Sequence, residues 1–227
     1  MNFDTQTERI IQIILKSFLP LLEAGLKFTI PVALISFGLG IIVALATALA
    51  RISKFKVLRF ISGFYVWIVR GTPLLVQLFI IFYGLPRAGI TLEPITAAII
   101  GFTLNVGAYT SEVIRAAILS IPKGQWEAAF SVGMNSRQAL TRIILPQAAR
   151  VSVPPLFNSF ISLIKDTSLA STITLTEMFQ IAQRITATTY EPLVLYCEAA
   201  VIYLLFCSML SFIQHRIENR LERYVAK

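Results

Sequence analysis

Several charged and polar side chains of this sequence lie inside or at the ends of long apolar runs. Lys165, Asp166 and Thr167 are consecutive near the end of one run, and Arg70 and Thr72 interrupt another. A charged group in a bilayer is costly, so each needs a partner or a polar cavity. A zwitterionic solute needs a cation for its carboxylate and an acceptor for its ammonium group, and Lys165 and Asp166 supply both. These residues predict a solute path; the alternative for Lys165 and Asp166 is a solvated helix end.

The other polar residues within apolar runs each allow two interpretations. Asn105 and Glu112 fall on one helical stripe, and Arg115 is three residues beyond Glu112, within pairing distance. We therefore favour an internal ion pair for Glu112 over a direct solute contact. Gln77 either lines the path or bonds to a neighbouring helix. Arg70, before Gly71, either faces the path or pairs locally at a kink.

Residues for enzyme chemistry are sparse. The single histidine, His215, has no second metal-ligating residue near it, and the two cysteines, Cys197 and Cys207, stand ten residues apart. We expect no metal and no catalytic residue, which argues against an intramembrane enzyme. A G-x-x-x-x-G-K-[ST] stretch, which cradles nucleotide phosphates, does not occur in the sequence. The chain therefore cannot hydrolyse ATP alone.

The composition predicts an all-α integral membrane protein. Of 227 residues, 56% are hydrophobic and 14% are charged. Runs of about 20 apolar residues match a hydrocarbon core of roughly 30 Å. We place five membrane-spanning helices, at Leu26–Ala50, Phe60–Gly84, Ile95–Leu119, Val151–Ser171 and Pro192–Ile213.

Basic residues set the expected topology of these spans. The net charge of +8 is concentrated in three groups between or after the apolar runs. Loops rich in Lys and Arg stay in the cytoplasm, so the N-terminus is expected outside and the C-terminal tail, 215–227, inside. Residues 1–24 predict an interfacial helix on the extracellular side, ahead of one membrane domain at 25–214. The three basic groups are Arg51, Lys54, Lys56 and Arg59; Lys123, Arg137, Arg142 and Arg150; and Arg216, Arg220, Arg223 and Lys227.

A long loop, residues 120–150, separates the third and fourth spans; we call it the coupling loop. Pro122 is suited to open a helix there, and Gly133 to end it in a left-handed turn. Asn135 or Ser136 can cap a second helix, which Pro146 would end or kink. The pattern predicts a compact cytoplasmic helix–turn–helix. Composition alone would favour the alternative, an amphipathic loop resting on lipid headgroups.

Four stretches resemble a known family. In the coupling loop, Glu127-Ala128-Ala129, then Gly133, then Ile144-Leu145-Pro146 resemble the EAA motif in membrane subunits of ATP-binding-cassette (ABC) importers. The other three stretches resemble the polar amino-acid branch, which carries histidine, glutamine, arginine or cystine, and among these the cystine-type permeases most. They are RGTPLLVQLF (Arg70–Phe79), GAYTSEVIRAAILSIPKGQWEAA (Gly107–Ala129) and SLIKDTSLAS (Ser162–Ser171).

The resemblance implies how the coupling loop works. In that family a cytoplasmic coupling helix inserts into a separate ATPase subunit, which binds ATP and Mg. By resemblance Glu127, Ala128, Ala129 and Gly133 form this helix, and the segment from Ile144 to Pro146 braces it. Glu127 is expected in the first helical turn, where the helix dipole favours negative charge. Small residues at 128 and 129 are expected to permit close approach by the partner.

The same resemblance implies an assembly. The type I importer fold pairs two permease subunits, here expected to be identical, with two ATPase subunits and an extracellular or periplasmic solute-binding protein. The expected role is import of polar amino acids, with L-cystine the expected substrate, across a bacterial cell membrane. The alternative is an ion-gradient-driven secondary amino-acid transporter, which would be expected to show internal repeats. No repeat is evident in the sequence.

Overall fold

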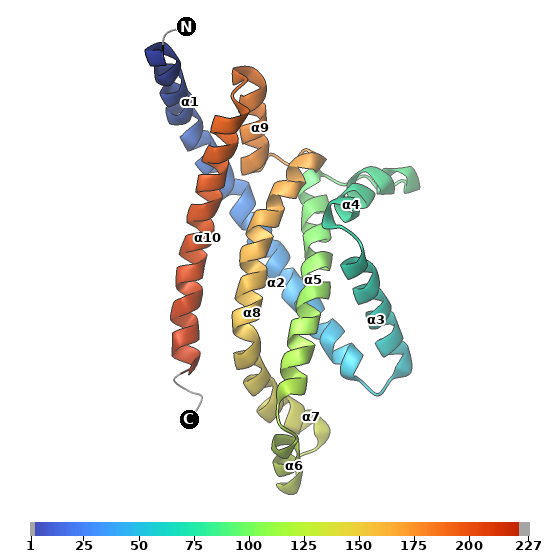
Figure 1. Cartoon of the computed structure of the whole chain (residues 1–227). Coiled ribbons are helices and arrows are strands. Elements are labelled where there is room, and N and C mark those ends of the chain that lie inside the picture. Colours follow the sequence, from blue (N-terminus) through green and yellow to red (C-terminus); the bar gives the residue numbers. More distant parts are fainter. Residues whose placement is uncertain (1–2, 223–227) are drawn as a thin grey trace. The chain divides into compact units, whose positions relative to one another are not determined.

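The computed structural model describes residues 3–222, and side chains within 6–220. Every regular element in this range is a helix of the α, 3-10 or π type (Figure 1), so the all-α prediction is confirmed. Arg223 and Lys227 of the third basic group lie outside the described residues. In chain order the elements are α1 (Phe3–Ala24), η1 (Gly25–Thr29), α2 (Ile30–Ile52), α3 (Lys56–Gly71), α4 (Leu74–Phe79), η2 (Ile80–Gly84), η3 (Leu85–Ala88), α5 (Pro94–Ser120), α6 (Lys123–Ser131), α7 (Ser136–Ala139), η4 (Leu140–Ile144), α8 (Leu145–Asp166), η5 (Thr167–Ile173), α9 (Met178–Thr189) and α10 (Pro192–Glu222).

The described chain forms two compact units. The first contains the described residues of Met1–Ser36, Leu74–Phe102 and Ile161–Phe212. The second contains those of Phe37–Pro73, Thr103–Phe160 and Ile213–Lys227. Helices α2, α5, α8 and α10 each contribute residues to both units.

The N-terminal segment continues into the first span without a break. Helix α1 leads through the π-helical turn η1 into α2, giving an apolar helical segment over Gln6–Ile52. The predicted boundary between residues 24 and 25 therefore falls within continuous helix. The interfacial position of residues 1–24 stays a prediction.

The second predicted span is interrupted, contrary to a continuous helix over Phe60–Gly84. Helix α3 ends at Gly71 and α4 begins at Leu74. Proline has no N–H to donate and disfavours helical conformation in the residue before it. Thr72, which precedes Pro73, is accordingly extended, with φ −122° and ψ 146°.

The remaining spans differ from prediction at their ends. Helix α5 matches its predicted bounds to within one residue at each end. Helix α10 continues to Glu222, so the predicted tail from residue 215 is helical as far as it is described. Helix α9, a short amphipathic helix between the fourth and fifth spans, was not predicted.

By length and composition, three helical segments of the described chain can cross a membrane. A fourth is added if α3 and the following helices count as one broken span. Helix α8, which corresponds to the fourth predicted span, is 22 residues long but contains Pro154, Pro155 and several polar residues, and it falls short on apolar composition.

Small residues let helices of the second unit approach closely. A Cβ atom on Gly107 of α5 would lie 2.7 Å from Val43 Cγ1 and 2.8 Å from the hydroxyl oxygen of Tyr65. That hydroxyl donates a hydrogen bond to the Leu104 carbonyl at 2.5 Å. Such close contact is a general means of packing helices in membranes, where the hydrophobic effect does not drive them together.

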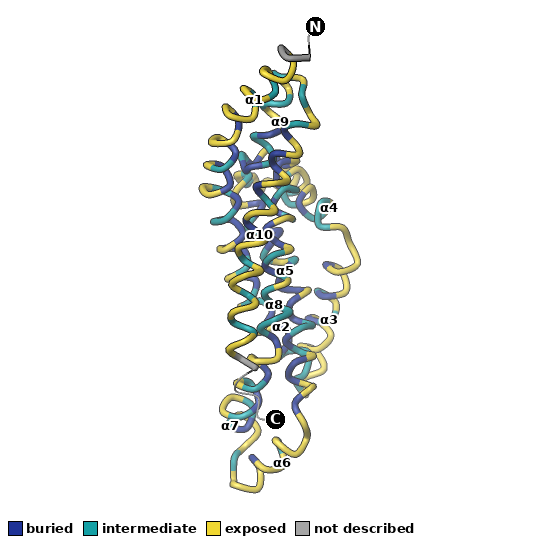
Figure 2. Tube along the Cα trace, turned by 60° about the vertical axis from the view of Figure 1, so that its left-hand side comes forward, coloured by how far each residue is buried: buried dark blue, intermediate teal, exposed yellow. Residues whose placement is uncertain are grey.

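Polar contacts join α9 and α10 to α1 in the first unit. Arg9 Nη2 donates to the Thr189 carbonyl at 2.8 Å and lies 3.7 Å from Glu191 Oε1. Ser17 donates to Glu198 of α10 at 2.5 Å, and both side chains are buried. In Figure 2 most of α1 and α10 is exposed. Their buried residues recur at helical spacing, as expected for helices with one packed face: Ser17, Leu21 and Ala24 in α1, and Leu195, Glu198, Ala199, Ile202 and Phe206 in α10.

Candidate functional site

The coupling loop contains the predicted first helix, α6. Pro122 is its N-cap, with φ −55° and ψ 140°, and the helix starts at Lys123. Glu127 is therefore in the second turn, and the prediction that it lies in the first turn is wrong. Because the dipole acts within the first turn, the helix end gives Glu127 little stabilisation.

The three residues of the Glu-Ala-Ala motif do not share one surface. Glu127 and Ala128 are exposed, as is most of α6 in Figure 2, whereas Ala129 is 4% exposed. Ala129 therefore packs inside the loop, and the close approach of a partner at Ala128 and Ala129 stays a prediction. The outer face of α6 instead presents Phe130, 47% exposed, and Val132 follows the helix at 73% exposed.

The turn between α6 and α7 follows the prediction. Gly133 has φ +81°, in the left-handed region, and its N–H donates to the Phe130 carbonyl at 3.0 Å. Asn135 caps α7: its side chain accepts from Gln138 N, and the Gln138 side chain accepts from Asn135 N, both at 2.9 Å. This reciprocal pair satisfies donors that a helix start leaves free, and it selects Asn135 over Ser136 as the cap.

Pro146 neither ends nor separates the second helix. Helix α7 leads through the π-helical turn η4 into α8, which contains Pro146 in its first turn. In the π turn the N–H of Leu145 reaches back to the carbonyl of Leu140. Because proline cannot make the normal bond to the residue four before it, we attribute the π turn to Pro146.

An apolar core fixes the coupling loop to the spans in the second unit. Ile144, fully buried, and Ala148 pack with Ala44 and Ala48 of α2, and with Ala117 and three isoleucines in the last turns of α5 and directly after it. Trp126 of α6 packs against the same core. Helix α6 is therefore in direct side-chain contact, through Trp126, with the core that α2 and α5 also form. The isoleucines are Ile114, Ile118 and Ile121.

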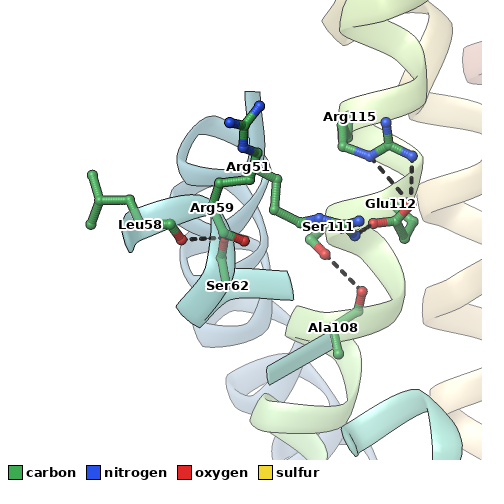
Figure 3. Close-up of polar contacts among 8 residues, drawn as sticks. All are labelled: Arg51, Leu58, Arg59, Ser62, Ala108, Ser111, Glu112 and Arg115. Atoms are coloured by element: carbon green, nitrogen blue, oxygen red, sulfur yellow. Dashed lines mark hydrogen bonds and ion pairs between the residues drawn. The ribbon is translucent and has the colours of Figure 1, made fainter. Parts of the chain in front are cut away.

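An arginine–glutamate cluster lies beside this core. Glu112 of α5 forms ion pairs with Arg51 of α2 and with Arg115 one turn further along α5 (Figure 3). Arg115 Nη2 lies 2.8 Å from Glu112 Oε2. The predicted Glu112–Arg115 pair is confirmed, and Arg51 is an additional partner that sequence spacing could not reveal. Ser62 and Ser111 bond to carbonyls of their own helices, as Figure 3 shows.

The other polar candidates of the second unit lie around the end of α3. The Arg70 guanidinium carbon is 5.3 Å from the ring centroid of Tyr109, so Arg70 makes a cation–π contact. Thr72 donates to the Ile68 carbonyl at 2.9 Å. Arg70, Thr72 and Tyr109 are exposed within the single chain, and Asn105 is partly buried.

A cavity of about 520 Å³ lies in the first unit, among α8, η5, α9 and α10. This volume falls in the range of about 300–1,000 Å³ that is usual for small-molecule sites. Lys165 and Ser168 bring polar groups to its wall, and the other lining residues are mostly aromatic or small. We call it the aromatic pocket; it is lined by Lys165, Ser168, Phe179, Tyr196, Ala199, Ala200, Tyr203, Leu204 and Cys207.

The predicted path residues are distributed between the units. Lys165 is the one predicted residue in the wall of the aromatic pocket. Asp166 is partly buried beside it, and Thr167 is fully buried with its hydroxyl on the Ile164 carbonyl. Gln77 lies on α4, also in the first unit. Arg70, Thr72, Asn105 and Glu112 belong to the second unit.

Sequence reasoning missed Glu177, which lies in the connection before α9. Its side chain is fully buried, and it caps α9 by accepting from Gln180 N at 2.8 Å. Its second oxygen accepts from the Tyr203 hydroxyl at 2.9 Å. Burial raises the pKa of the Glu177 carboxyl to about 7, and these hydrogen bonds oppose the shift. Glutamate is not among the residues preferred at an N-cap, so the sequence held no clear signal for this one.

An all-helical chain with apolar spans, a solute-sized pocket and a helix packed on the ends of two spans defines a membrane-spanning transport subunit. The family model described as "Binding-protein-dependent transport system inner membrane component" matches residues 36–223. The chain belongs to this family.

Known proteins similar in sequence to this chain match it over most of their length. The chain is 58% identical over 213 residues to the L-cystine transport system permease protein TcyB of Bacillus subtilis, covering 93% of this chain and 91% of the relative. It is 40% identical to the probable amino-acid ABC transporter permease protein YckA of the same organism, covering 91% of each. It is 35% identical to the glutamine transport system permease protein GlnP of Escherichia coli, covering 90% and 94%.

Solved structures lead to the same class. A crystal structure of an amino acid ABC transporter with histidines matches with TM-score 0.85 and 31% identity, over 97% of this chain and 99% of that chain. An inward-facing MetNI methionine ABC transporter matches with TM-score 0.70 at 20% identity, which supports the fold alone. The chain is thus a multi-pass permease subunit of a bacterial ABC amino-acid importer, and separate ATPase subunits and a partner permease complete such importers. The comparisons give no support to an ion-gradient-driven secondary transporter.

Proposed function

We propose that this chain is the permease subunit of an importer for L-cystine. The observation that carries the proposal is the 58% identity to the L-cystine permease TcyB, against 35% to the glutamine permease GlnP over a similar length. Substrate choice within one family depends on a few contacts in the binding site. A relative that shares more than half of its residues supports the same substrate better than one that shares about a third.

The aromatic pocket is our candidate for the substrate site. Cystine has a zwitterion at each end and an apolar disulfide between them. The Lys165 ammonium is suited to a substrate carboxylate, and the neighbouring Asp166, which is partly buried, to a substrate ammonium group. Phe179 and Tyr196, whose ring centroids are 5.4 Å apart, offer an aromatic surface for the disulfide. Thr167 supports this segment from inside.

The other predicted path residues take secondary places in the proposal. Arg70, Thr72, Gln77 and Asn105 are not in the wall of the aromatic pocket, and we keep them as proposed contacts elsewhere on the solute path. Glu112 has a structural part, because its carboxylate is already shared between Arg51 and Arg115. A carboxylate engaged by two guanidinium groups has little capacity left for substrate.

The proposed assembly contains two identical permease subunits, two ATPase subunits that bind ATP and Mg, and an extracellular or periplasmic solute-binding protein. The coupling loop faces the cytoplasm, with Glu127 and Ala128 on the surface that meets the ATPase. Ala129, Gly133, Ile144 and Pro146 hold that surface in shape. The N-terminus then lies outside and the C-terminus inside.

Uptake by reconstituted vesicles tests the substrate. The permease is purified with its ATPase, placed in liposomes containing ATP, and given labelled amino acids with the binding protein. We expect saturable uptake of cystine and little uptake of glutamine, histidine or arginine. Lys165→Ala should raise the apparent KM for cystine, whereas Lys27→Ala, an exposed lysine paired with Glu23, should not. Uptake of another amino acid in preference to cystine would refute the substrate assignment.

A further inference from the structure

Glu177 is placed where a change in its side chain would reach the aromatic pocket. It lies outside the membrane-spanning helices, in the connection between η5 and α9, and is fully buried. It does not line the pocket itself. Burial of a carboxyl group is costly unless the group is hydrogen-bonded, so its bonds are expected to hold it in one orientation.

The two carboxyl oxygens of Glu177 bond to different helices. Oε1 accepts from the N–H of Gln180 in the first turn of α9, at 2.8 Å. Oε2 accepts from the Tyr203 hydroxyl on α10, at 2.9 Å. The Met178 N–H reaches Thr29 Oγ1 at 3.4 Å, which connects the start of α9 to η1 as well. One side chain therefore fixes the start of α9 relative to the middle of α10.

Both helices to which Glu177 is hydrogen-bonded, α9 and α10, contribute residues to the wall of the aromatic pocket. Tyr203 lines it from α10, and Phe179, two residues after Glu177, lines it from α9. Phe179 also packs on Tyr196, a third aromatic wall. These three rings form the aromatic part of the wall, and the Glu177–Tyr203 bond links the segment that carries Phe179 to the helix that carries Tyr196 and Tyr203.

We propose that Glu177 is a positioning residue for substrate binding, which acts by holding Tyr203 and the start of α9 in the wall of the aromatic pocket. This inference rests on the proposed use of that pocket for substrate. It assigns Glu177 an effect on substrate affinity, while coupling to ATP hydrolysis depends on the coupling loop in the other unit.

The test compares Glu177→Gln, Tyr203→Phe and the double variant in the reconstituted importer. The change at 177 keeps one acceptor and the change at 203 keeps the ring, so both single variants preserve packing. Each is expected to raise the apparent KM by about three- to tenfold, the usual effect of one hydrogen bond, with kcat little changed. Because both remove the same bond, the double variant should show no more than the larger single effect.

The matched control is Arg9→Gln, which removes the polar contacts of α1 with the end of α9 at Thr189 and Glu191. It disturbs attachment of the same helix away from the pocket, so its KM should equal that of the wild type. Unchanged KM in both single variants, additive effects in the double variant, or an equal KM rise in Arg9→Gln would overturn the inference.

Two further measurements keep this test independent of folding and of the substrate assignment. Basal ATP hydrolysis and elution as a single species show whether each variant complex is intact, and Glu177→Asp replaces a variant that fails to assemble. The variants are compared on whichever amino acid of the panel the wild type carries. A wild type that prefers another amino acid refutes the cystine proposal and leaves the KM comparison valid.

Discussion

Two carboxyl groups, one in each unit, are held by different kinds of interaction, ion pairs in one case and hydrogen bonds from neutral donors in the other. Glu112 in the second unit lies between two guanidinium groups, from Arg51 and Arg115. Glu177 in the first unit receives hydrogen bonds from a hydroxyl and a backbone amide, from Tyr203 and Gln180, and forms no ion pair among the described residues. The first arrangement joins spans by charge next to the coupling loop, and the second shapes a pocket wall with neutral donors.

The difference indicates that the two carboxyl groups have different roles, one in joining helices and the other in shaping a binding site. A partly buried ion pair stabilises only while both charges remain in place, which would suit the junction through which we propose that movement passes. Neutral hydrogen bonds cost less to change and depend more on direction, which suits the geometry of a binding site. Substitution of Glu112 should therefore lower the stability of the whole subunit, whereas substitution of Glu177 should chiefly lower the affinity for substrate.

The largest difference is expected between Glu112→Gln and Glu177→Gln. At position 112 the change leaves Arg51 and Arg115 without a counter-charge; the cost is about 3–5 kcal/mol for a fully buried pair and is expected to be lower here, because these side chains are 20–31% exposed. At position 177 an acceptor remains, and about 1 kcal/mol is expected. Both losses of stability are measured by heating the detergent-purified complex and determining the fraction that remains folded. Adding Arg51→Gln should recover part of the loss at 112, and equal losses at the two sites would break the comparison.

Two glycines sharpen the comparison of packing in the units. Gly107→Ala would bring its Cβ against the Val43 side chain and the Tyr65 hydroxyl. Neither can move away easily, because the Val43 side chain is short and branched and the Tyr65 hydroxyl is hydrogen-bonded to the Leu104 carbonyl. Gly25→Ala would meet the ring edge of Phe206 at 2.9 Å, which can rotate away. We expect a loss of about 1–3 kcal/mol at 107 and a smaller one at 25. Thermal unfolding in detergent measures both, and a larger loss at 25 would contradict this account.

Alanine substitutions at two glycines with left-handed backbone conformation distinguish the effect of backbone strain from an effect on coupling. Gly133 in the coupling loop has φ +81° and Gly89 after η3 has φ +82°, and a Cβ added to either would meet no neighbouring atom within 4 Å. Alanine should cost about 1–2 kcal/mol at each because of the left-handed conformation. Transport per folded complex should fall only for Gly133→Ala, because α6 is then displaced. A similar fall for Gly89→Ala would show that strain alone impairs transport.

The smallest expected effect is a pH dependence of stability at Glu177. Its pKa is about 7 in the fold, against an ordinary value of 4.5. The folded protein therefore binds the proton more tightly, and this stabilisation is complete at low pH and lost as pH rises through about 7. The fall in Tm between about pH 5 and about pH 8 should be smaller in Glu177→Gln than in the wild type. Identical slopes would contradict the raised pKa.

Much of the fold follows from the sequence because apolar runs and proline act locally. The bounds of α5 were predicted to within one residue, and the turn at Gly133 with its Asn135 cap follows from conformational preference. The break at Thr72 needs only the known effect of Pro73. Pro146 does not end the helix as one of the two predicted alternatives had it, because a π turn redistributes the hydrogen bonds before it, and a π turn has no sequence signal as clear as proline itself.

The sites were harder to predict because they depend on residues distant in sequence. The spacing of Glu112 and Arg115 indicated one ion pair, but Arg51 comes from another helix, far earlier in the chain. Glu177 and Tyr203 are likewise 26 residues apart, and α9 between them is too short to show as a span. Lys165 was identified through its charge, whereas the aromatic pocket walls look like ordinary lipid-facing residues.

The central claim is that the exposed face of α6 receives movement from an ATPase and passes it through the apolar core to α2 and α5. The most direct test is ATP-driven uptake by the reconstituted complex carrying Glu127→Lys, with Glu93→Lys, an exposed charge reversal before α5, as control. We expect uptake and substrate-stimulated ATP hydrolysis to fall by at least about tenfold for Glu127→Lys, with normal membrane insertion and a normal control. Wild-type uptake by Glu127→Lys would contradict the account.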